Sequence, residues 1–225
     1  GSNASCGLDT LMVSPNAFVC SNVGANTVTL TAVDNSGNTS NCTATVTVLD
    51  TISPTATCQD ITIYLDGSGS AYITAGNIDN GSADNCAVAS LSATPTSFNC
   101  SNVGSNTVTL TVIDVNGNSS ACTSTVTVQD TINPTAVCQD ITVYLDATGD
   151  LSISSVDIDG GSADNCGVAT LTIDGGNTTQ SFDCSEVGTN TGTLTVTDVN
   201  GNVSTCDATV TVQDTVPPSA ICQDI

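Results

Sequence analysis

Short stretches in which apolar and polar residues alternate recur along the whole chain. TVTLTVIDV starts at Thr107 and TSTVTV starts at Thr123, and threonine occupies most of the polar positions. This alternation is typical of β-strands that bury one face, and the NGN sequence at 116–118 is typical of a tight hairpin turn between them. No segment keeps a helical period, so the pattern predicts an all-β protein.

The strand pattern belongs to a long internal repeat. SNVGANTVTL at Ser21 returns as SNVGSNTVTL at Ser101 and as SEVGTNTGTL at Ser185, which gives periods of 80 and 84 residues. DTISPTATCQDITIYLD at Asp50 returns in similar form at Asp130 and starts again at Asp214. Each period holds about seven short strands separated by turn signals, as in an immunoglobulin-type β-sandwich.

The repeat predicts tandem immunoglobulin-like β-sandwich domains in an elongated, disulfide-stapled array. Its phase predicts four segments: the C-terminal part of a repeat at 1–50, complete repeats at 51–130 and 131–214, and the first strand of a following repeat at 215–225. The proline-containing DTISP and DTINP stretches are expected to be the linkers between sandwiches.

The charged residues are all acidic. The 225-residue chain has 22 Asp and Glu residues, of which only Glu186 is a glutamate, and no Lys, Arg or His, so its formal net charge is -22. Carboxylates without cationic partners must face water, accept backbone hydrogen bonds or bind metal ions. The charge repels nucleic acid and anionic membranes, no apolar span is long enough for direct membrane insertion, and the lack of His and Lys argues against an enzyme.

Twelve cysteines in a chain of this length indicate disulfide bonds and an oxidising compartment. A zinc site is disfavoured, because the sequence has no Cys-x-x-Cys pair and no histidine. We therefore expect an exported, extracellular protein at a cell surface.

Three motifs together resemble a known family. CQDITVYLD, DNCG and FNCSNVGSNTVTLTVIDVNGNSSACTSTVTV resemble the hyalin-repeat (HYR) class of immunoglobulin-like domain, and their Cys-rich, Asp-rich, Lys-free form is similar to tandem repeats of large cell-surface adhesins of gliding Bacteroidota. The resemblance implies a structural stalk or filament segment of an extracellular bacterial adhesin, which extends a binding or motility element from the cell. The alternative is a carbohydrate- or surface-binding adhesive module. The implied partners are neighbouring repeats or copies of the same protein and, for the alternative, surface glycans.

The sandwich topology predicts which cysteines pair. The first strand of such a sandwich runs beside the last, so the cysteines that start these two strands are expected to be bonded, and the second pair of each repeat is expected to bridge a hairpin. The expected bonds are Cys58–Cys122 and Cys138–Cys206 of the first kind and Cys6–Cys20, Cys86–Cys100 and Cys166–Cys184 of the second, with Cys42 and Cys222 pairing outside this segment. A rival scheme bonds Cys42 to Cys58, Cys122 to Cys138 and Cys206 to Cys222.

Surface proteins of the resembled group carry O-glycans on Asp-Thr followed by an apolar residue. The resemblance therefore implies glycosylation at Thr10, Thr51, Thr131 and Thr215. The competing interpretation is that Asp-Thr-Ile is linker chemistry, in which Asp caps a turn and Ile fills the junction.

Three carboxylates from distant stretches are expected to meet where the chain enters each complete repeat. In a sandwich of this type the entering linker, the loop with the sequence GSADNC and the last hairpin turn lie at one end of the domain. The carboxylates are Asp50, Asp84 and Asp114 in one repeat and Asp130, Asp164 and Asp198 in the next, with Asp159 nearby as a further ligand.

Oxygen ligands without nitrogen or sulfur select Ca²⁺, so calcium is the expected cofactor of these clusters, and the cysteine of GSADNC would clamp the loop. The alternative, that the carboxylates only cap turns, stays open. The first copy of the loop, GSNASC at 1–6, has Ala4 in place of the aspartate.

Overall fold

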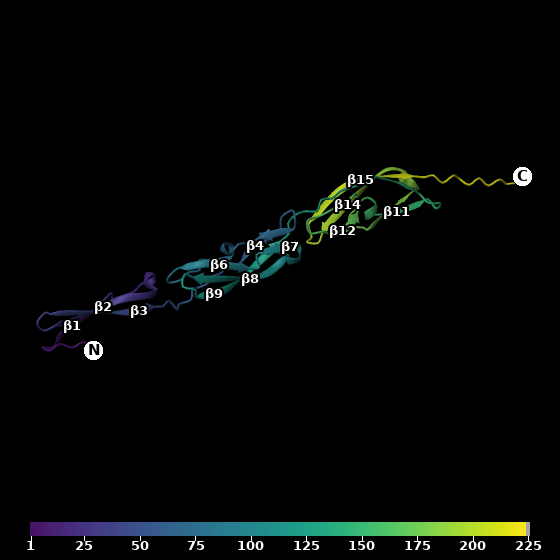
Figure 1. Cartoon of the computed structure of the whole chain (residues 1–225). Coiled ribbons are helices and arrows are strands. Elements are labelled where there is room, and N and C mark those ends of the chain that lie inside the picture. Colours follow the sequence, from purple (N-terminus) through teal and green to yellow (C-terminus); the bar gives the residue numbers. More distant parts are fainter. Residues whose placement is uncertain (224–225) are drawn as a thin grey trace. The chain divides into compact units, whose positions relative to one another are not determined.

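The computed structural model describes residues 1–223, and within them the secondary structure is β-strand apart from short helical turns (Figure 1). The first repeat contains an antiparallel sheet in the order β1-β2-β3. Its strands are β1 (Leu8–Ser14), β2 (Gly24–Asp34) and β3 (Thr39–Val48), and a 3-10 helix η1 (Cys20–Asn22) precedes β2.

The second repeat contains a four-stranded and a two-stranded sheet. The larger sheet has the order β4-β9-β8-β6, and the smaller one pairs β5 with β7. The strands are β4 (Ile61–Tyr64), β5 (Ser70–Tyr72), β6 (Val88–Thr94), β7 (Ser97–Asn99), β8 (Gly104–Asp114) and β9 (Ser119–Gln129), with the short helices α1 (Ala75–Ile78) and η2 (Cys100–Asn102).

The third repeat reproduces this arrangement. Its larger sheet has the order β10-β15-β14-β12, and its smaller sheet pairs β11 with β13. The strands are β10 (Ile141–Tyr144), β11 (Asp150–Ser154), β12 (Val168–Ile173), β13 (Thr179–Asp183), β14 (Gly188–Asp198) and β15 (Val203–Gln213), with η3 (Ser155–Asp157) and η4 (Cys184–Glu186).

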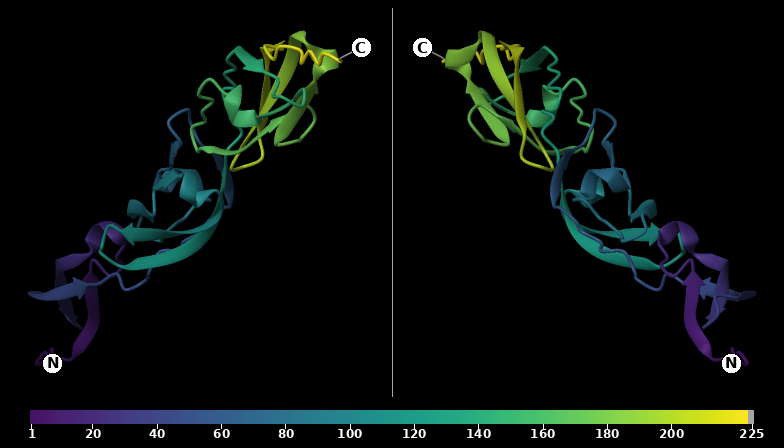
Figure 2. Two further views of the ribbon diagram at one scale, coloured as in Figure 1. Left: turned by 90° about the vertical axis from the view of Figure 1, so that its right-hand side faces the viewer. Right: turned by 90° about the vertical axis from the view of Figure 1, so that its left-hand side faces the viewer.

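The first strand of each complete repeat runs parallel to the last, as an immunoglobulin-like sandwich requires. Ile61 of β4 pairs with Val126 of β9, and Ile141 of β10 pairs with Val210 of β15. The other pairs of the larger sheet in the third repeat are antiparallel, and the hairpin of β14 and β15 is its longest element (Figure 2). The all-β prediction is confirmed by these sheets.

The alternation of apolar residues with threonine separates the two faces of each strand. Along β14, Leu194 and Val196 are completely buried, and they pack with Ile158, Ile173 and Phe182 in the core of the third repeat. Burying one such side chain stabilises the fold by about 1.5–3 kcal/mol, whereas the threonines supply β-propensity on the other face.

The chain forms two compact units whose bounds differ from the repeat period. Unit 1 comprises residues 1–60, 74–95 and 107–125, and unit 2 comprises 61–73, 96–106 and 126–225. The domain boundaries at 50, 130 and 214 therefore remain a prediction from the sequence. No helix in the described residues has the length and apolar character needed to span a bilayer.

The described part of the predicted segment 215–225 contains no strand. In the two complete repeats the first strand starts three residues after the linker cysteine, at Ile61 and Ile141. The equivalent start after Cys222 is Ile225, which lies outside the described residues together with Asp224.

Candidate functional site

The structure brings together the three carboxylates of the first predicted cluster. One oxygen from each of Asp50, Asp84 and Asp114 lies within 4.8 Å of the others. Asp50 comes from the linker before β4, Asp84 from the loop before β6, and Asp114 from the end of β8. All three belong to unit 1, so the cluster is formed within one compact body.

A second cluster of the same composition lies in unit 2. Oxygens of Asp130, Asp164 and Asp198 also lie within 4.8 Å of one another. Asp130 is 8% exposed and Asp198 is 2% exposed. Negative groups at this distance and burial repel one another strongly, and the sequence contains no Lys, Arg or His to compensate them.

Two carboxylate oxygens in each cluster are buried without a hydrogen-bond partner. They are Asp50 Oδ2 and Asp84 Oδ1 in the first cluster and the equivalent Asp130 Oδ2 and Asp164 Oδ1 in the second. A buried charged acceptor without a donor is costly, and buried carboxylates are otherwise paired or bound to a metal. The same two atoms are left free in both repeats, which is the arrangement that a cation ligand needs.

The third carboxylate of each cluster is fixed in place by its own hairpin turn. Asp114 Oδ1 accepts hydrogen bonds from the Asn116 and Asn118 backbone amides, both at 2.8 Å, and Asp114 Oδ2 accepts from Asn118 Nδ2 at 2.8 Å. Asn118 Nδ2 also donates to the Asp50 carbonyl oxygen at 3.2 Å and so ties the turn to the linker. Asp198, Asn200, Asn202 and Asp130 repeat this network.

These hydrogen bonds keep the third carboxylate ionised. Burial raises the pKa of Asp114, but the hydrogen bonds from Asn118, Asn116 and Gly117 outweigh burial and hold the pKa below its ordinary value. The same balance, with burial opposed by Asn202, Asn200 and Gly201, lowers the pKa of Asp198. A charged ligand is therefore ready at each cluster at neutral pH.

Turn capping accounts for only part of the carboxylate oxygens. Asp84 Oδ2 accepts from the Cys86 amide at 2.7 Å, and Asp50 Oδ1 accepts from the Ile52 amide at 3.1 Å. These contacts are the caps of the alternative interpretation. They use one oxygen of each residue and leave the second, buried oxygen without a donor, so capping and cation binding are compatible.

Asp159 does not join the second cluster. Its Oδ1 accepts a hydrogen bond from the Ser162 amide at 2.9 Å, and its backbone forms a bridge with Cys138. Asp159 is not one of the three carboxylates that lie within 4.8 Å of one another, and one of its oxygens caps the start of the Gly161–Cys166 loop. Its expected role as a further ligand stays a prediction.

Two of the expected disulfides are present and three are not. Cys58 is bonded to Cys122 and Cys138 to Cys206, with Cα–Cα distances of 6.0 and 5.8 Å. The expected bonds Cys6–Cys20, Cys86–Cys100 and Cys166–Cys184 are wrong. Instead, Cys20 is bonded to Cys86 and Cys100 to Cys166, so each bond joins one repeat to the GSADNC loop of the next.

The topology explains this correction. The hairpin bridge required β6 and β7 to pair, but β6 pairs with β8 and β7 pairs with β5, so the two arms belong to different sheets. Cys86 therefore does not face Cys100. A sequence signal was available: the bonded pairs keep a constant separation of 66 residues, whereas the expected hairpin pairs are separated by 14 residues in one repeat and 18 in the next.

Each linker-crossing disulfide lies directly beside a cluster. The Cys86 amide bonds Asp84, and the Asn85 carbonyl lies 3.4 Å from Cys20 Sγ. In unit 2, Asn165 Nδ2 donates to the Asp66 carbonyl, and the Asn165 carbonyl lies 3.5 Å from Cys100 Sγ. The disulfide thus fixes the loop that carries Asp84 or Asp164.

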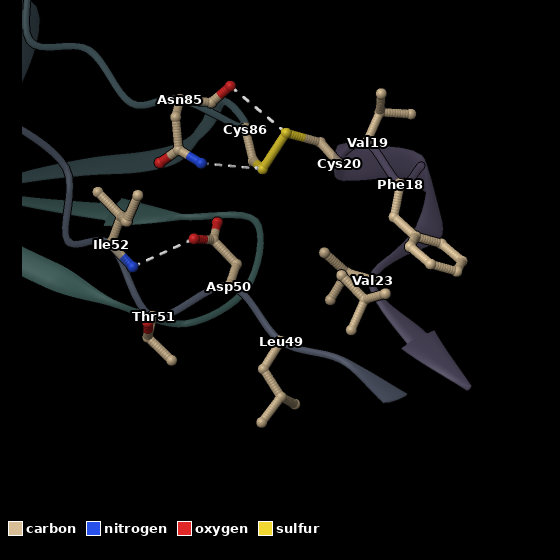
Figure 3. Close-up of a pocket in the computed structure, with 11 residues that line it drawn as sticks. Phe18, Val19, Cys20, Val23, Leu49, Asp50, Thr51, Ile52, Asn85 and Cys86 are labelled. Atoms are coloured by element: carbon tan, nitrogen blue, oxygen red, sulfur yellow. Dashed lines mark hydrogen bonds between the residues drawn. A yellow bond between two sulfur atoms is a disulfide. The ribbon is translucent and has the colours of Figure 1, made fainter. Parts of the chain in front are cut away.

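A pocket of about 290 Å³ opens beside the first cluster (Figure 3). The figure shows the Asp50 carboxylate between Ile52 and the Cys20–Cys86 disulfide, with Leu49 below it and Phe18 at the right of the view. Near the second cluster the turn Asp66–Ser70 contacts the loop that carries Asp164, since Asn165 Nδ2 donates to the Asp66 carbonyl at 3.2 Å.

The four threonines expected to carry glycans are solvent-exposed. They are Thr10, Thr51, Thr131 and Thr215. Exposure permits modification, and glycosylation stays a prediction that an intact-mass measurement of native protein can test.

No protein-family model matches this all-β chain with its two acidic clusters. The chain is similar to hyalin of Strongylocentrotus purpuratus, with 36% identity over 208 residues that cover 87% of this chain and 17% of that protein. The chain thus spans about one sixth of the length of this relative, and the similarity supports a hyalin-repeat-like family.

Similar solved structures have immunoglobulin-like or cadherin folds. Protocadherin gamma C5 EC1-3 shares 13% identity at a TM-score of 0.41, covering 86% of this chain and 79% of that chain. Titin domains I67-I69 share 10% identity at a TM-score of 0.36, covering 84% of this chain and 75% of that chain.

Proposed function

We propose that this chain is a structural stalk or filament segment of an extracellular bacterial surface adhesin, in which Ca²⁺ and disulfides stiffen the linkers between repeats. The segment would extend a binding or motility element from the cell. The hyalin similarity and the repeat motifs support a role in an extracellular array, and the four disulfides suit an oxidising environment.

The observation that carries the proposal is the equivalence of the two carboxylate clusters. Each cluster combines a linker aspartate, a loop aspartate and a hairpin aspartate, and each leaves the same two buried oxygens without donors. Ca²⁺ takes about six to eight oxygen ligands, and asparagine side chains, linker carbonyls and solvent water would be of the right chemical type to complete its shell. A divalent ion would remove most of the repulsion among three carboxylates.

Ion and disulfide would act on the same short stretch of chain. The cation would hold the linker residue Asp130 to Asp164 and Asp198, while Cys100–Cys166 holds the same loop from the other side of the linker. A linker restrained at two points transmits force with little bending, which is what a stalk requires.

A calcium titration tests the proposal. Isothermal calorimetry on the whole chain should detect binding, and the melting temperature should fall after EDTA treatment. Asp130→Asn should remove part of the calcium-dependent shift. The matched control is Asp214→Asn, because Asp214 makes the same turn contact, at 2.9 Å to the Val216 amide, but belongs to neither described cluster.

X-ray scattering with and without calcium tests the mechanical part. The maximum dimension should become better defined in calcium and the scattering should indicate greater flexibility in EDTA. If calorimetry detects no binding heat, and if scattering and melting temperature are the same in calcium and in EDTA, the carboxylates are turn caps only.

A further inference from the structure

Two asparagine side chains beside the second cluster carry buried oxygens that accept no hydrogen bond. The atoms are Asn165 Oδ1 and Asn200 Oδ1. Both residues belong to unit 2, as do Asp130, Asp164 and Asp198 of the cluster. A buried amide oxygen without a partner costs free energy, although less than a buried carboxylate oxygen because it is uncharged. Each of the two oxygens therefore lacks a donor or a cation as its partner.

Asn165 lies directly against the cluster. It follows Asp164 in the chain, and its Nδ2 donates to the Asp66 carbonyl oxygen at 3.2 Å and to Asp130 Oδ1 at 3.4 Å. Both neighbours are acceptors, so they fix the amide with its nitrogen toward them. The amide oxygen cannot take that place, and it stays buried without a donor.

Asn200 is held near the cluster by the hairpin turn between β14 and β15. Its backbone amide donates to Asp198 Oδ1 at 2.8 Å, and Asn202 Nδ2, two residues later, donates to the Asp130 carbonyl oxygen at 3.3 Å. The turn therefore contacts two members of the cluster, one on each side of Asn200. The Asn200 side-chain oxygen is buried on this turn and has no donor.

The combination of carboxylate and amide oxygens suits Ca²⁺ better than Mg²⁺. Ca²⁺ takes about six to eight oxygen ligands, asparagine side chains among them, whereas Mg²⁺ keeps several waters and uses one or two carboxylates. Three aspartates alone leave a calcium shell incomplete. A further carboxylate would add repulsion in a chain without Lys, Arg or His, and an amide oxygen adds a ligand without adding charge.

A pocket gives solvent a path to this side of the cluster. It has a volume of about 270 Å³, and its lining includes Asp164 and Asn165 together with Gly67 and Asn133. An ion that exchanges with solvent needs such an entry path to a buried site.

We propose that Asn165 and Asn200 are calcium ligands of the second cluster, through their side-chain oxygens, and that they make this site selective for Ca²⁺ over Mg²⁺. The inference rests on the proposed function, because it names further ligands of an ion that the three aspartates would hold. The two asparagines supply neutral ligands, and the aspartates supply the charge.

Calorimetry on the whole chain with Asp84→Asn tests the assignment, because this background keeps only the second cluster intact. Asn200→Ala removes the amide oxygen and should lower calcium affinity by roughly tenfold or more, as should Asn165→Ala. Asn200→Asp keeps an oxygen at the same place and should retain or raise the affinity. The matched control is Asn116→Ala, since Asn116 is the exposed equivalent of Asn200 in the other hairpin turn.

Europium(III) luminescence gives a readout that does not depend on stability. Europium replaces calcium at oxygen sites, and its lifetimes in H₂O and D₂O report the number of waters on the ion. Asn165→Ala and Asn200→Ala should each add about one water, because solvent replaces the lost ligand, and Asn116→Ala should add none. Asp84→Asn/Asp164→Asn, which disrupts both clusters, corrects for europium at exposed carboxylates. The preference for calcium over magnesium should fall in the same two alanine variants.

The outcomes separate this inference from the proposed function. If the Asp84→Asn chain binds neither calcium nor europium above that correction, both are overturned. If it binds calcium, and Asn165→Ala and Asn200→Ala leave affinity, water number and ion preference unchanged, only the ligand assignment is overturned. An equal loss of affinity in Asn200→Asp and Asn200→Ala would also overturn the assignment, since the oxygen would then not be what the ion requires.

Discussion

Asp50 and Asp130 occupy the same position in successive repeats, yet Asp130 is buried and Asp50 is only half-buried. Both belong to clusters with the same partners and the same free oxygens. The turn Asp66–Ser70 packs near the second cluster, where Asn165 Nδ2 donates to the Asp66 carbonyl, and a pocket lies beside the first cluster. The local sequence thus specifies the ligands of a site, and segments from elsewhere in the chain affect how deeply the site is buried.

The largest effect expected from either junction is loss of its disulfide. Cys20–Cys86 and Cys100–Cys166 both close loops with a sequence separation of 66 residues, and the chain-entropy relation gives about 4 kcal/mol for such a loop. Cys20→Ser/Cys86→Ser and Cys100→Ser/Cys166→Ser should therefore destabilise the protein by similar amounts in urea unfolding. A much larger effect at the second junction would show that native packing, rather than loop closure, dominates there.

The next effect concerns calcium affinity. Asp84→Asn leaves only the second cluster intact, and Asp164→Asn leaves only the first. Calcium should bind more tightly to the Asp84→Asn variant, by roughly tenfold or about 1.4 kcal/mol, because charges in a more buried site interact through a lower dielectric. Calorimetry on the two variants measures the ratio. Equal affinities would mean that the covering turn does not affect the ion site.

An effect of comparable size is expected from the covering turn itself. Gly69 has a φ of +73°, and a Cβ there would lie 2.7 Å from Cys100 Sγ and 2.9 Å from the Asn165 carbonyl oxygen. Gly69→Ala should cost about 1–3 kcal/mol, since the backbone conformation and the crowding both oppose a side chain. Gly67→Ala is the matched control, because a Cβ at Gly67 meets nothing within 4 Å. Urea unfolding should show that Gly69→Ala is less stable than Gly67→Ala. Equal stabilities of the two variants would show that the turn Asp66–Ser70 is not closely packed beside the second cluster.

The smallest effect is a pH dependence. Because the folded pKa of Asp198 is lowered, the unfolded chain binds the proton first as the pH falls. The stabilisation is therefore complete above the unfolded pKa of about 3.9 and is lost as the pH falls through the lower folded value. In EDTA, the wild-type protein should lose more stability between pH 5 and pH 3 than Asp198→Asn. If both lose the same amount, the hydrogen bonds of the hairpin turn do not carry the effect.

Much of the architecture could be predicted because it depends on local pattern. The threonine alternation along β8 and β14 predicted strands with one buried face, and NGN predicted the hairpin turns. The parallel pairing of the first and last strands located Cys58 beside Cys122. The convergence of Asp50, Asp84 and Asp114 also followed from topology, since the three stretches lie at one end of such a sandwich.

The disulfides across the linkers and the position of Asp159 could not be predicted in the same way. The assumption that Cys86 and Cys100 face each other treated β6 and β7 as one hairpin, but their hydrogen bonds go to strands of two different sheets. Asp159 was expected near the second cluster, but it is not one of the three carboxylates that the structure brings together there, and its Oδ1 accepts a hydrogen bond from the Ser162 amide.

By itself, the sequence determined the β-strands, their period, the carboxylate chemistry and the need for disulfides, because each depends on composition and on neighbours close along the chain. Only the tertiary structure decided which thiols meet, which carboxylate oxygens remain without donors and how deeply each cluster is buried. These properties depend on distances between residues that are tens of positions apart, and such distances are set by the way the sheets and linkers pack.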